Sequence, residues 1–265
     1  MRGSDLRRCG GHPLPFVMGI LNATPDSFSD GGHYLDADAA VEHAFAMIDA
    51  GAEIIDVGAE STRPGFTPVS AEEEISRLIP VIRRISESAD VPISADTMKP
   101  EVAVQALEAG ADMINDVNAL RAPGMLDAVA ERDVPVIIMH MPGEPGSVHS
   151  GDMSDPVIPS IVSYLSERIS SAEEAGIRRD NIIIDPGVGF GKTMAQNIEI
   201  VNNLDIIDLG VPVLAGLSRK RFLADMYPGE DRDAATVKAC MVAAERGADI
   251  LREHDPGALR RALRR

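Results

Sequence analysis

The sequence contains one junction three times, as Gly51-Ala52-Glu53, as Gly110-Ala111-Asp112 and as Gly247-Ala248-Asp249. Each glycine follows a segment with helical periodicity, and each acidic residue precedes a short apolar run. Glycine just after a helix supplies the left-handed backbone conformation that ends the helix. The junction therefore predicts a repeated strand–helix unit. Because the spacing between the copies is not constant, it does not predict a solenoid.

Eight short apolar or β-branched runs alternate with longer segments of helical periodicity. The predicted strands are 16–21, 54–57, 91–95, 113–115, 134–139, 182–184, 211–215 and 249–251. The predicted helices include 37–50, 72–87, 100–109, 158–175 and 234–246. Eight such units favour an α/β fold of the single (β/α)8 TIM barrel type. A Rossmann sheet is the alternative, but the sequence after the first run, Leu21-Asn22-Ala23-Thr24-Pro25, lacks its glycine fingerprint.

The chain has 265 residues, of which 45% are hydrophobic, so a disordered chain is excluded. Single barrels reach about 250 residues. We therefore expect one domain over 1–265, in which 1–14 form a short N-terminal extension. No apolar run approaches the roughly 18 residues of a membrane span, and 1–12 contain no secretory signal. The two cysteines, Cys9 and Cys240, have neither metal-site nor disulfide spacing, so the cytoplasm is the expected location.

Acidic residues outnumber basic ones by 42 to 25, which gives a net charge of −17 at pH 7. A field of this sign repels nucleic acids and anionic membranes, so neither is an expected partner. In such a protein, arginine and lysine side chains that gather in one site indicate that the site binds an anion.

In a (β/α)8 barrel the active site lies at the carboxyl ends of the strands, and all eight predicted strands are followed by polar residues. Asp96, Asn115 and Asp185 follow the third, fourth and sixth strands and would converge on the barrel axis. A carboxylate accepts two parallel N–H bonds, and an amide both donates and accepts. The set suits a flat, nitrogen-rich heterocycle. For any one aspartate, a helix cap or an ion pair with Lys220 is an equal alternative.

A second set of residues at the strand ends is basic. It consists of Arg63, Lys220, Arg252 and His254. These side chains predict a site for phosphate or carboxylate.

Two further motifs carry weaker signals. The stretch 187–193, Gly-Val-Gly-Phe-Gly-Lys-Thr, is similar to a phosphate-binding P-loop, but the glycine required five residues before Gly191 is Pro186. His140 stands between Met139 and Met141, with no second histidine or cysteine at ligand spacing. We therefore expect a structural histidine rather than a zinc ligand.

The chain resembles the dihydropteroate synthase family from residue 16 to about residue 263. Five motifs carry the resemblance: GILNATPDSFSDGG at 19–32, DVGAESTRPG at 56–65, DPGVGFGKT at 185–193, GLSRK at 216–220 and REHD at 252–255. The first two are long and specific, and the order and spacing of all five fit the family.

The resemblance implies a barrel enzyme of folate biosynthesis, a transferase that joins p-aminobenzoate to 6-hydroxymethyl-7,8-dihydropterin pyrophosphate and releases pyrophosphate. It assigns the pterin edge to Asp96, Asn115, Asp185 and Lys220. It assigns pyrophosphate to Arg252 and His254, with Arg252 also beside the pterin. It implies that Asn22 helps to bind the Mg²⁺ that bridges pyrophosphate. The aminobenzoate site would be lined by Thr62, Arg63, Pro64, Phe190 and Ser218.

In the implied reaction the departure of pyrophosphate is the difficult step, because an aryl amine is weakly basic and needs no dedicated base. Asp30 would face the cation left on the methylene carbon. The side chains implied to take part in the reaction are Asp30, Arg63, Lys220, Arg252 and His254. The resemblance also implies that the protein forms a homodimer and that sulfonamides inhibit it.

Three residues depart from the family pattern. Ala59 replaces a glycine, Pro142 replaces a glutamine, and Glu253 replaces a valine. Because successive side chains of a strand alternate between its faces, we expect Glu253 to point away from Arg252 and His254.

Three alternative functions stay open. A related barrel could couple the same pterin to a ribosylated aminobenzoate, as in methanopterin synthesis. A pterin-binding methyltransferase domain would bind the pterin without releasing pyrophosphate. A non-catalytic barrel subunit would do neither, although the complete set of motif residues disfavours it.

Overall fold

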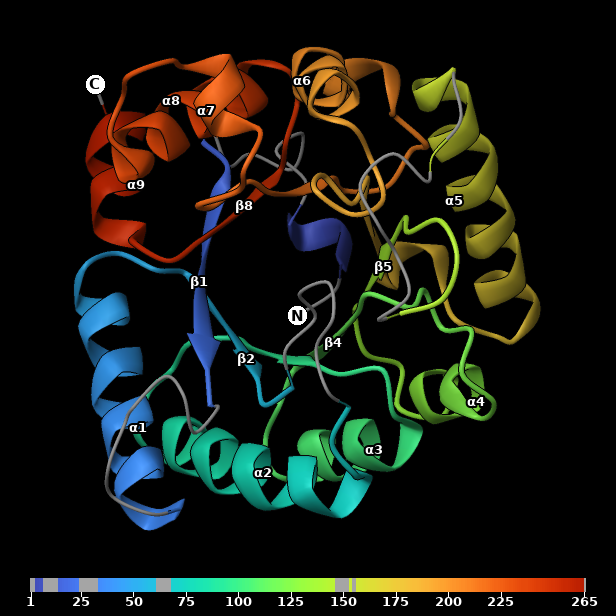
Figure 1. Ribbon diagram of the computed structural model, residues 1–265. Helices are drawn as coiled ribbons and strands as arrows, with labels where there is room; N and C mark the ends of the chain where they lie inside the picture. The colour runs from blue at the N-terminus through green and yellow to red at the C-terminus, as the bar shows by residue number, and fades with distance from the viewer. Residues whose placement is uncertain are drawn as a thin grey trace.

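The computed structural model describes residues 3–6, 14–23, 33–60, 68–145, 153 and 156–264. Eight parallel strands form a ring with the helices outside it (Figure 1). The strands are β1 (Phe16–Asn22), β2 (Ile54–Gly58), β3 (Ile93–Asp96), β4 (Met113–Asp116), β5 (Val136–Met139), β6 (Ile182–Asp185), β7 (Leu214–Gly216) and β8 (Ile250–Glu253). Each of the eight overlaps a predicted strand, so the predicted (β/α)8 barrel is confirmed.

Helices connect the strands and cover the barrel. They are α1 (His33–Asp49), α2 (Ala71–Ser88), α3 (Pro100–Glu108), α4 (Met125–Ala130), α5 (Val157–Glu174), α6 (Met194–Asn202), α7 (Leu223–Met226), α8 (Arg232–Glu245) and α9 (Pro256–Leu263). Short 3-10 turns lie at η1 (Gly3–Leu6), η4 (Arg179–Asn181) and η5 (Leu204–Ile206). No helix in these described ranges is long and apolar enough to cross a membrane.

The ring is paired in the order β6-β5-β4-β3-β2-β1-β8-β7 and closes weakly between β6 and β7. These two strands are joined by one isolated bridge between Ile184 and Val213. The N–H of Ile184 donates to the carbonyl of Pro212 at 2.9 Å, and proline has no N–H to give in return. The predicted strand 211–215 therefore begins only at Leu214.

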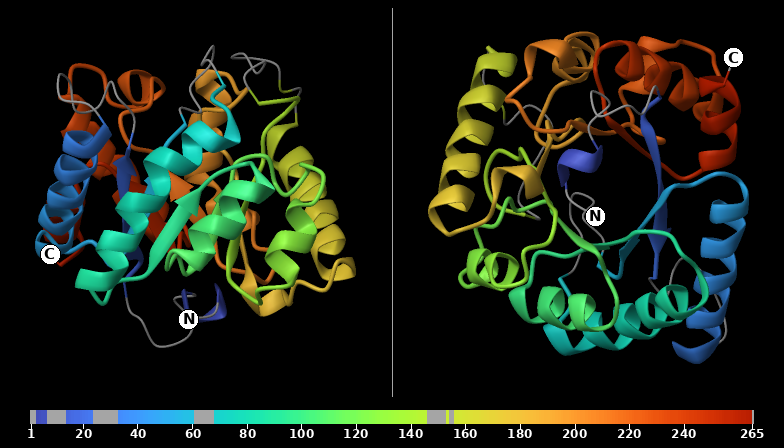
Figure 2. Two further views of the ribbon diagram at one scale, coloured as in Figure 1. Left: turned by 90° about the horizontal axis from the view of Figure 1, so that it is seen from below. Right: turned by 180° about the vertical axis from the view of Figure 1, so that it is seen from behind.

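The amino end of the barrel is filled by apolar side chains. The buried cluster inside it consists of Leu6, Met18, Ile54, Met113, Ile137, Ile183, Leu214 and Ile250. Leu6 belongs to η1, so the part of 1–14 that the structure describes packs under the strands (Figure 2, left). Because apolar side chains fill the amino end, the buried polar and charged residues of the described strands, such as Asp56, Asn115 and Asp185, gather at the carboxyl end.

The repeated junction has the predicted glycine conformation and a second feature that the sequence pattern did not reveal. The φ angles of Gly51, Gly110 and Gly247 are 106°, 110° and 98°. The acid two residues later accepts a backbone N–H where the neighbouring strand begins. These bonds are Val17 N to Glu53 Oε2 at 3.1 Å, Ile93 N to Asp112 Oδ2 at 2.8 Å, and Val213 N to Asp249 Oδ2 at 2.9 Å. Each junction thus ends a helix and also fixes the next strand beside its neighbour.

Alanine at Gly110 should destabilise the protein more than alanine at Gly247. Either substitution places a side chain at positive φ, which costs about 1–2 kcal/mol. A Cβ at 247 meets nothing within 4 Å, whereas a Cβ at 110 lies 2.7 Å from the Cβ of Ser86. The Ser86 hydroxyl is held by two backbone carbonyls and cannot easily turn aside. We expect Gly110→Ala to lower the free energy of unfolding in urea by about 1 kcal/mol more than Gly247→Ala. Equal losses would contradict this explanation.

Candidate active site

Arg252 forms the centre of a partly buried charge cluster at the carboxyl ends of four strands. Its Nε lies 2.5 Å from Oδ2 of Asp56 on β2, and its Nη2 lies 2.8 Å from Oδ2 of Asp96 on β3. Asn115 on β4 donates from Nδ2 to the same Asp56 oxygen at 3.1 Å. Of the guanidinium nitrogens, Nη1 makes no bond to any residue that the structure describes. One cation therefore holds two acids and keeps one donor position for a further group.

The balance of charge in this cluster favours a proton or a donor on Asp96. Burial raises the pKa of Asp96 to about 8, with the neighbouring Asp56 adding to the rise and Arg252 opposing it. Burial alone would lower the pKa of Arg252, but Asp56 and Asp96 outweigh it and the pKa is raised. A ligand that offers N–H groups to Asp96 would replace the proton that the free protein holds there.

A second acid–base pair lies across the same end of the barrel. Asp185, the last residue of β6, accepts the N–H of Gly187 through Oδ1 at 2.7 Å. Its other oxygen, Oδ2, and Lys220 Nζ each lie 3.9 Å from the point that a Cβ on Gly216 would occupy. Burial raises the pKa of Asp185 against the effect of Lys220, and burial lowers the pKa of Lys220 to about 8 against the effect of Asp185. Lys220 also donates to the carbonyl of Val188.

An apolar cluster stands beside these polar groups. Val117, Met139 and Met141 are buried in it, and Met98 and Phe190 pack partly buried against it. Met139 pairs with Asp185 in the sheet, so this cluster begins where the acid–base pair sits. The Phe190 ring also lies under Lys220, with Nζ 4.9 Å from its centroid. The arrangement offers a flat ring an apolar face and a polar, hydrogen-bonding edge.

The loop after β6 uses its lysine internally. Lys192 is 1% exposed, and its Nζ donates to the carbonyls of Gly187 at 2.7 Å and Phe190 at 3.0 Å. The same Nζ lies 3.0 Å from Nδ1 of His140. Burial lowers the pKa of Lys192 to about 7 and that of His140 to about 3, with Lys192 adding to the second shift. This lysine organises the loop and does not extend toward a phosphate, unlike the lysine of a P-loop.

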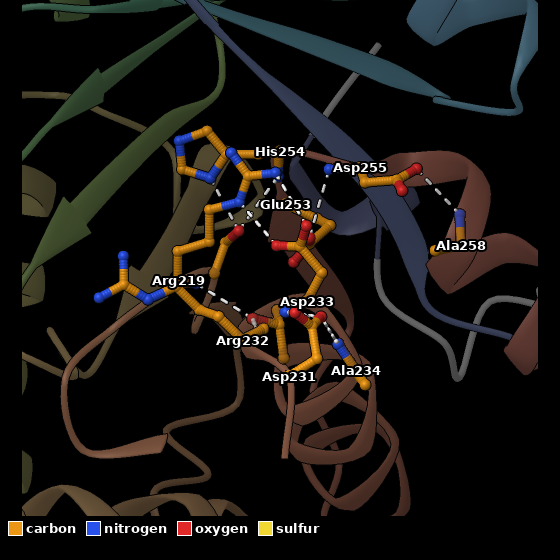
Figure 3. Close-up of polar contacts among 11 residues, drawn as sticks. Arg219, Asp231, Arg232, Asp233, Ala234, Glu253, His254, Asp255 and Ala258 are labelled. Carbon is orange, nitrogen blue, oxygen red and sulfur yellow. Dashed lines mark hydrogen bonds and ion pairs between the residues drawn. The ribbon is translucent and has the colours of Figure 1, made fainter. Parts of the chain in front are cut away.

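Ser218 and His254 meet just after the ends of β7 and β8. Figure 3 shows His254 together with its neighbours Glu253, Arg219 and Asp233. The Ser218 Oγ lies 2.7 Å from Nδ1 of His254 and accepts the His254 backbone N–H at 3.3 Å. The next residue, Arg219, has φ 55°, and its guanidinium binds Asp233 at 2.7 and 3.1 Å. Its backbone N–H donates to Thr236 Oγ1 at 3.1 Å. These bonds to α8 fix the turn that presents Ser218 and Lys220.

The structure gathers most of the predicted site residues at this end of the barrel. Those in the described ranges are Asn22, Asp96, Asn115, Asp185, Phe190, Ser218, Lys220, Arg252 and His254. Four others, Asp30, Thr62, Arg63 and Pro64, lie outside the described residues. The prediction omitted Asp56, which is fully buried and contacts both Arg252 and Asn115. Its signal was a carboxylate inside an otherwise apolar run.

Comparison with known proteins places this site in a family. The model of the pterin binding enzyme family matches residues 18–254. A dihydropteroate synthase of Clostridium beijerinckii is 48% identical over 245 residues, which cover 91% of this chain and 88% of that protein. The chain belongs to the dihydropteroate synthase family.

Other members of the dihydropteroate synthase family extend the comparison. A probable bifunctional folylpolyglutamate synthase/dihydropteroate synthase of Haloferax volcanii is 50% identical over 242 residues, 90% of this chain, and the match spans 29% of that longer protein. A structure of the Xanthomonas albilineans dihydropteroate synthase with 4-aminobenzoic acid superposes with a TM-score of 0.90 at 48% identity, covering 97% of this chain and 95% of that one.

Replacing Arg252 should make stability depend more strongly on pH. Without the guanidinium, the pKa of Asp96 rises further above its unfolded value. A carboxyl group with a raised pKa stabilises the folded protein fully below its unfolded pKa of about 4. This stabilisation by Asp96 is lost as pH rises through its folded pKa, about 8 or higher. We expect Arg252→Met to lose about 3 kcal/mol relative to wild type at about pH 8, and much less at about pH 5, in urea unfolding without ligand.

The control for this prediction removes an acid together with the cation. Arg252→Met combined with Asp56→Asn should recover at least half of the loss at high pH, because one carboxylate no longer faces another. A loss that is the same at both pH values would contradict the electrostatic interpretation.

Proposed function

We propose that this chain is a dihydropteroate synthase. It transfers the pterinylmethyl group of 6-hydroxymethyl-7,8-dihydropterin pyrophosphate to p-aminobenzoate, yielding 7,8-dihydropteroate and pyrophosphate. The observation that carries the proposal is the site itself, in which the acids Asp96 and Asp185 and the cations Lys220 and Arg252 surround an apolar wall at one end of the barrel. A related structure at 45% identity and TM-score 0.86 is described as a complex with 7,8-dihydropteroate.

The pterin would lie with its nitrogen-rich edge on the acids and its face on the apolar wall. Asp96, Asn115 and Asp185 supply acceptors and a donor for that edge, and Lys220 donates from the side of Asp185. The wall of Val117, Met139 and Phe190 excludes water from one face of the ring. Hydrogen bonds in such a place are specific, because an unmatched buried acid is costly.

Pyrophosphate would leave toward Arg252 and His254. Arg252 is held in place by two aspartates, its Nη1 bonds no residue in the described ranges, and His254 is oriented by Ser218. Cations fixed in advance stabilise the negative charge that develops as the bond to the methylene carbon breaks. The aryl amine is nucleophilic without prior deprotonation, so catalysis consists mainly of positioning and charge stabilisation.

Mg²⁺ is part of the proposal, with Asn22 as its protein ligand. Asn22 is the half-buried last residue of β1, and because β1 and β8 are parallel neighbours it stands at the same end of the barrel as Arg252. No group of three or more histidine, cysteine, aspartate or glutamate side chains suited to a metal occurs in the described ranges. One amide oxygen fits Mg²⁺ all the same, because this ion usually keeps several waters and binds through phosphate with one or two protein ligands. When bound, it would add charge neutralisation to that of Arg252.

The remaining assignments come from the family resemblance. Thr62, Arg63 and Pro64 would line the aminobenzoate site together with Phe190 and Ser218, and Asp30 would face the cationic carbon. A Yersinia pestis dihydropteroate synthase, 39% identical, is described in a complex with a sulfonamide drug, and we extend that sensitivity to this chain. A homodimer and a cytoplasmic location stay predictions of the same proposal.

Pyrophosphate release distinguishes the proposed function from its alternatives. A coupled phosphate assay measures pyrophosphate release from dihydropterin pyrophosphate in the presence of Mg²⁺. We expect pyrophosphate release to require p-aminobenzoate and to be much slower when a ribosylated aminobenzoate replaces it. A preference for the ribosylated amine would support the methanopterin alternative. Binding of the pterin without release would support the methyltransferase alternative, and no binding would support a non-catalytic subunit.

Asp185→Asn should weaken pterin binding by about 10- to 100-fold in calorimetry. The amide can still accept the Gly187 N–H, but it presents an NH₂ group toward Lys220 and the pterin donors where the carboxylate presents an acceptor. Asp116→Asn is the matched control. Asp116 is also buried at a strand end, but it accepts the N–H groups of Asn118 and Leu120 in its own loop, so pterin affinity should change little. Equal affinities in all three proteins would mean that Asp185 does not bind the pterin.

A further inference from the structure

Lys99, which follows β3, binds two acids that the proposed reaction does not use. Its Nζ lies 2.8 Å from Oε1 of Glu60 and also binds Oε2 of Glu74 on α2. Glu74 is fully buried, the Glu60 side chain is 6% exposed and the Lys99 side chain is 22% exposed. Burial alone would lower the pKa of Lys99, but Glu60 and Glu74 outweigh it and the pKa is raised. One lysine, which stays cationic, therefore offsets two largely buried carboxylates.

Glu60 joins two parts of the backbone through the same oxygen. It lies two residues after the end of β2, and its Oε1 also accepts the N–H of Val69 at 2.9 Å, just before α2 begins. Between Glu60 and Val69 the chain contains Thr62, Arg63 and Pro64, which the family resemblance assigns to the aminobenzoate site. One carboxylate oxygen thus connects the chain on both sides of these three residues.

This connection depends on the cation. A carboxylate that is largely removed from water is costly unless a positive charge is bound to it. Without Lys99, Glu60 would gain by turning its carboxylate toward water, and the Val69 N–H would lose its acceptor. Lys99 is itself held at the end of β3, because its backbone N–H donates to Thr97 Oγ1 at 3.2 Å.

We propose that Lys99 is a positioning residue for the amine substrate, which acts through Glu60 to hold the chain on both sides of Thr62, Arg63 and Pro64. The inference rests on the proposed function, in which these three residues line the aminobenzoate site. Lys99 acts without touching either substrate. It ties this part of the chain to β3, the strand that ends in the proposed pterin site, so both substrate sites share one anchor.

The test variant must remove the lysine without leaving an unbalanced acid. Glu74 raises the pKa of Asp96, so Lys99→Met alone would expose the pterin site to a charge that Lys99 no longer offsets. Lys99→Met combined with Glu74→Gln, here called the Lys99 double variant, leaves the net charge of the chain unchanged. Because no buried acid then lacks its partner on α2, this variant is also the one expected to fold.

The matched control removes another ion pair of α2. Arg77 and Glu73 bind each other one helical turn apart, and Arg77 reaches the carbonyl of Ala59 only at 3.5 Å. Arg77→Met combined with Glu73→Gln, the control double variant, makes the same chemical changes as the Lys99 double variant and spares Glu60.

The first measurement is steady-state kinetics with saturating dihydropterin pyrophosphate and Mg²⁺. The Lys99 double variant should raise the KM for p-aminobenzoate about tenfold, because the residues that contact the amine are displaced. Its affinity for a dihydropterin in calorimetry should stay within about twofold of wild type, because the pterin residues lie on the strands. The control double variant should change either quantity by less than about twofold.

The second measurement does not depend on activity. Hydrogen exchange at the Val69 N–H, followed by NMR, should be about tenfold faster in the Lys99 double variant and unchanged in the control. Adding Glu60→Gln to the Lys99 double variant should reverse both the exchange and the KM effects by at least half. The neutral amide can stay buried and accept the Val69 N–H without a cation. A lysine that acted only through packing would give no such recovery.

Several results would overturn the proposal. These are wild-type values of the KM and of Val69 exchange in the Lys99 double variant, an equal effect of the control, or no recovery with Glu60→Gln. An equal loss of affinity for the pterin and the amine would also overturn it, because it would indicate general destabilisation. If wild type does not use p-aminobenzoate at all, the proposed function fails, whereas faster Val69 exchange still shows that Lys99 holds Glu60 in place.

Discussion

The guanidinium of Arg252 joins the last strand of the barrel to two early strands at the site. It reaches Asp56 across 196 residues of sequence and Asp96 across 156, so β8 is tied to β2 and β3 by charge as well as through the sheet. Two carboxylates so close together repel each other, and without this cation the pKa of Asp96 would rise still further. A nitrogen-rich ligand requires acids at this end of the barrel. The site can hold Asp56 and Asp96 there because Arg252 binds both of them.

The rest of the barrel supports that cluster from both sides. Leu6 and the first residues of the strands fill the amino end with apolar side chains, so the charges are confined to the carboxyl end. The loop after β6 is folded around the buried Lys192, and the turn after β7 is fixed by the fork of Arg219 on Asp233. These contacts fix the two loops and do not bind the ligand. Together they place Asp185, Ser218 and Lys220 at the carboxyl end of the barrel.

Much of this arrangement could be predicted because it depends on local patterns. The apolar runs and the glycine junctions predicted eight strands, and the polar residues that follow them predicted the end that carries the site. Interactions between distant segments could not be predicted in the same way. Asp56 looked like one residue of a motif until Arg252 was placed beside it. The acids of the junctions, Glu53, Asp112 and Asp249, showed their role only once neighbouring strands were in register.

The central claim is that buried acids held by Arg252 recognise the N–H edge of a ligand, and proton release tests it most directly. Calorimetric titration with a dihydropterin at about pH 7, in buffers of different ionisation enthalpy, counts the protons exchanged on binding. Because the pKa of Asp96 is about 8 in the free protein, this carboxyl must ionise to accept ligand N–H groups. The account predicts net proton release that is largely lost in Asp96→Asn. Binding with no proton release, or with the same release in Asp96→Asn, would contradict it.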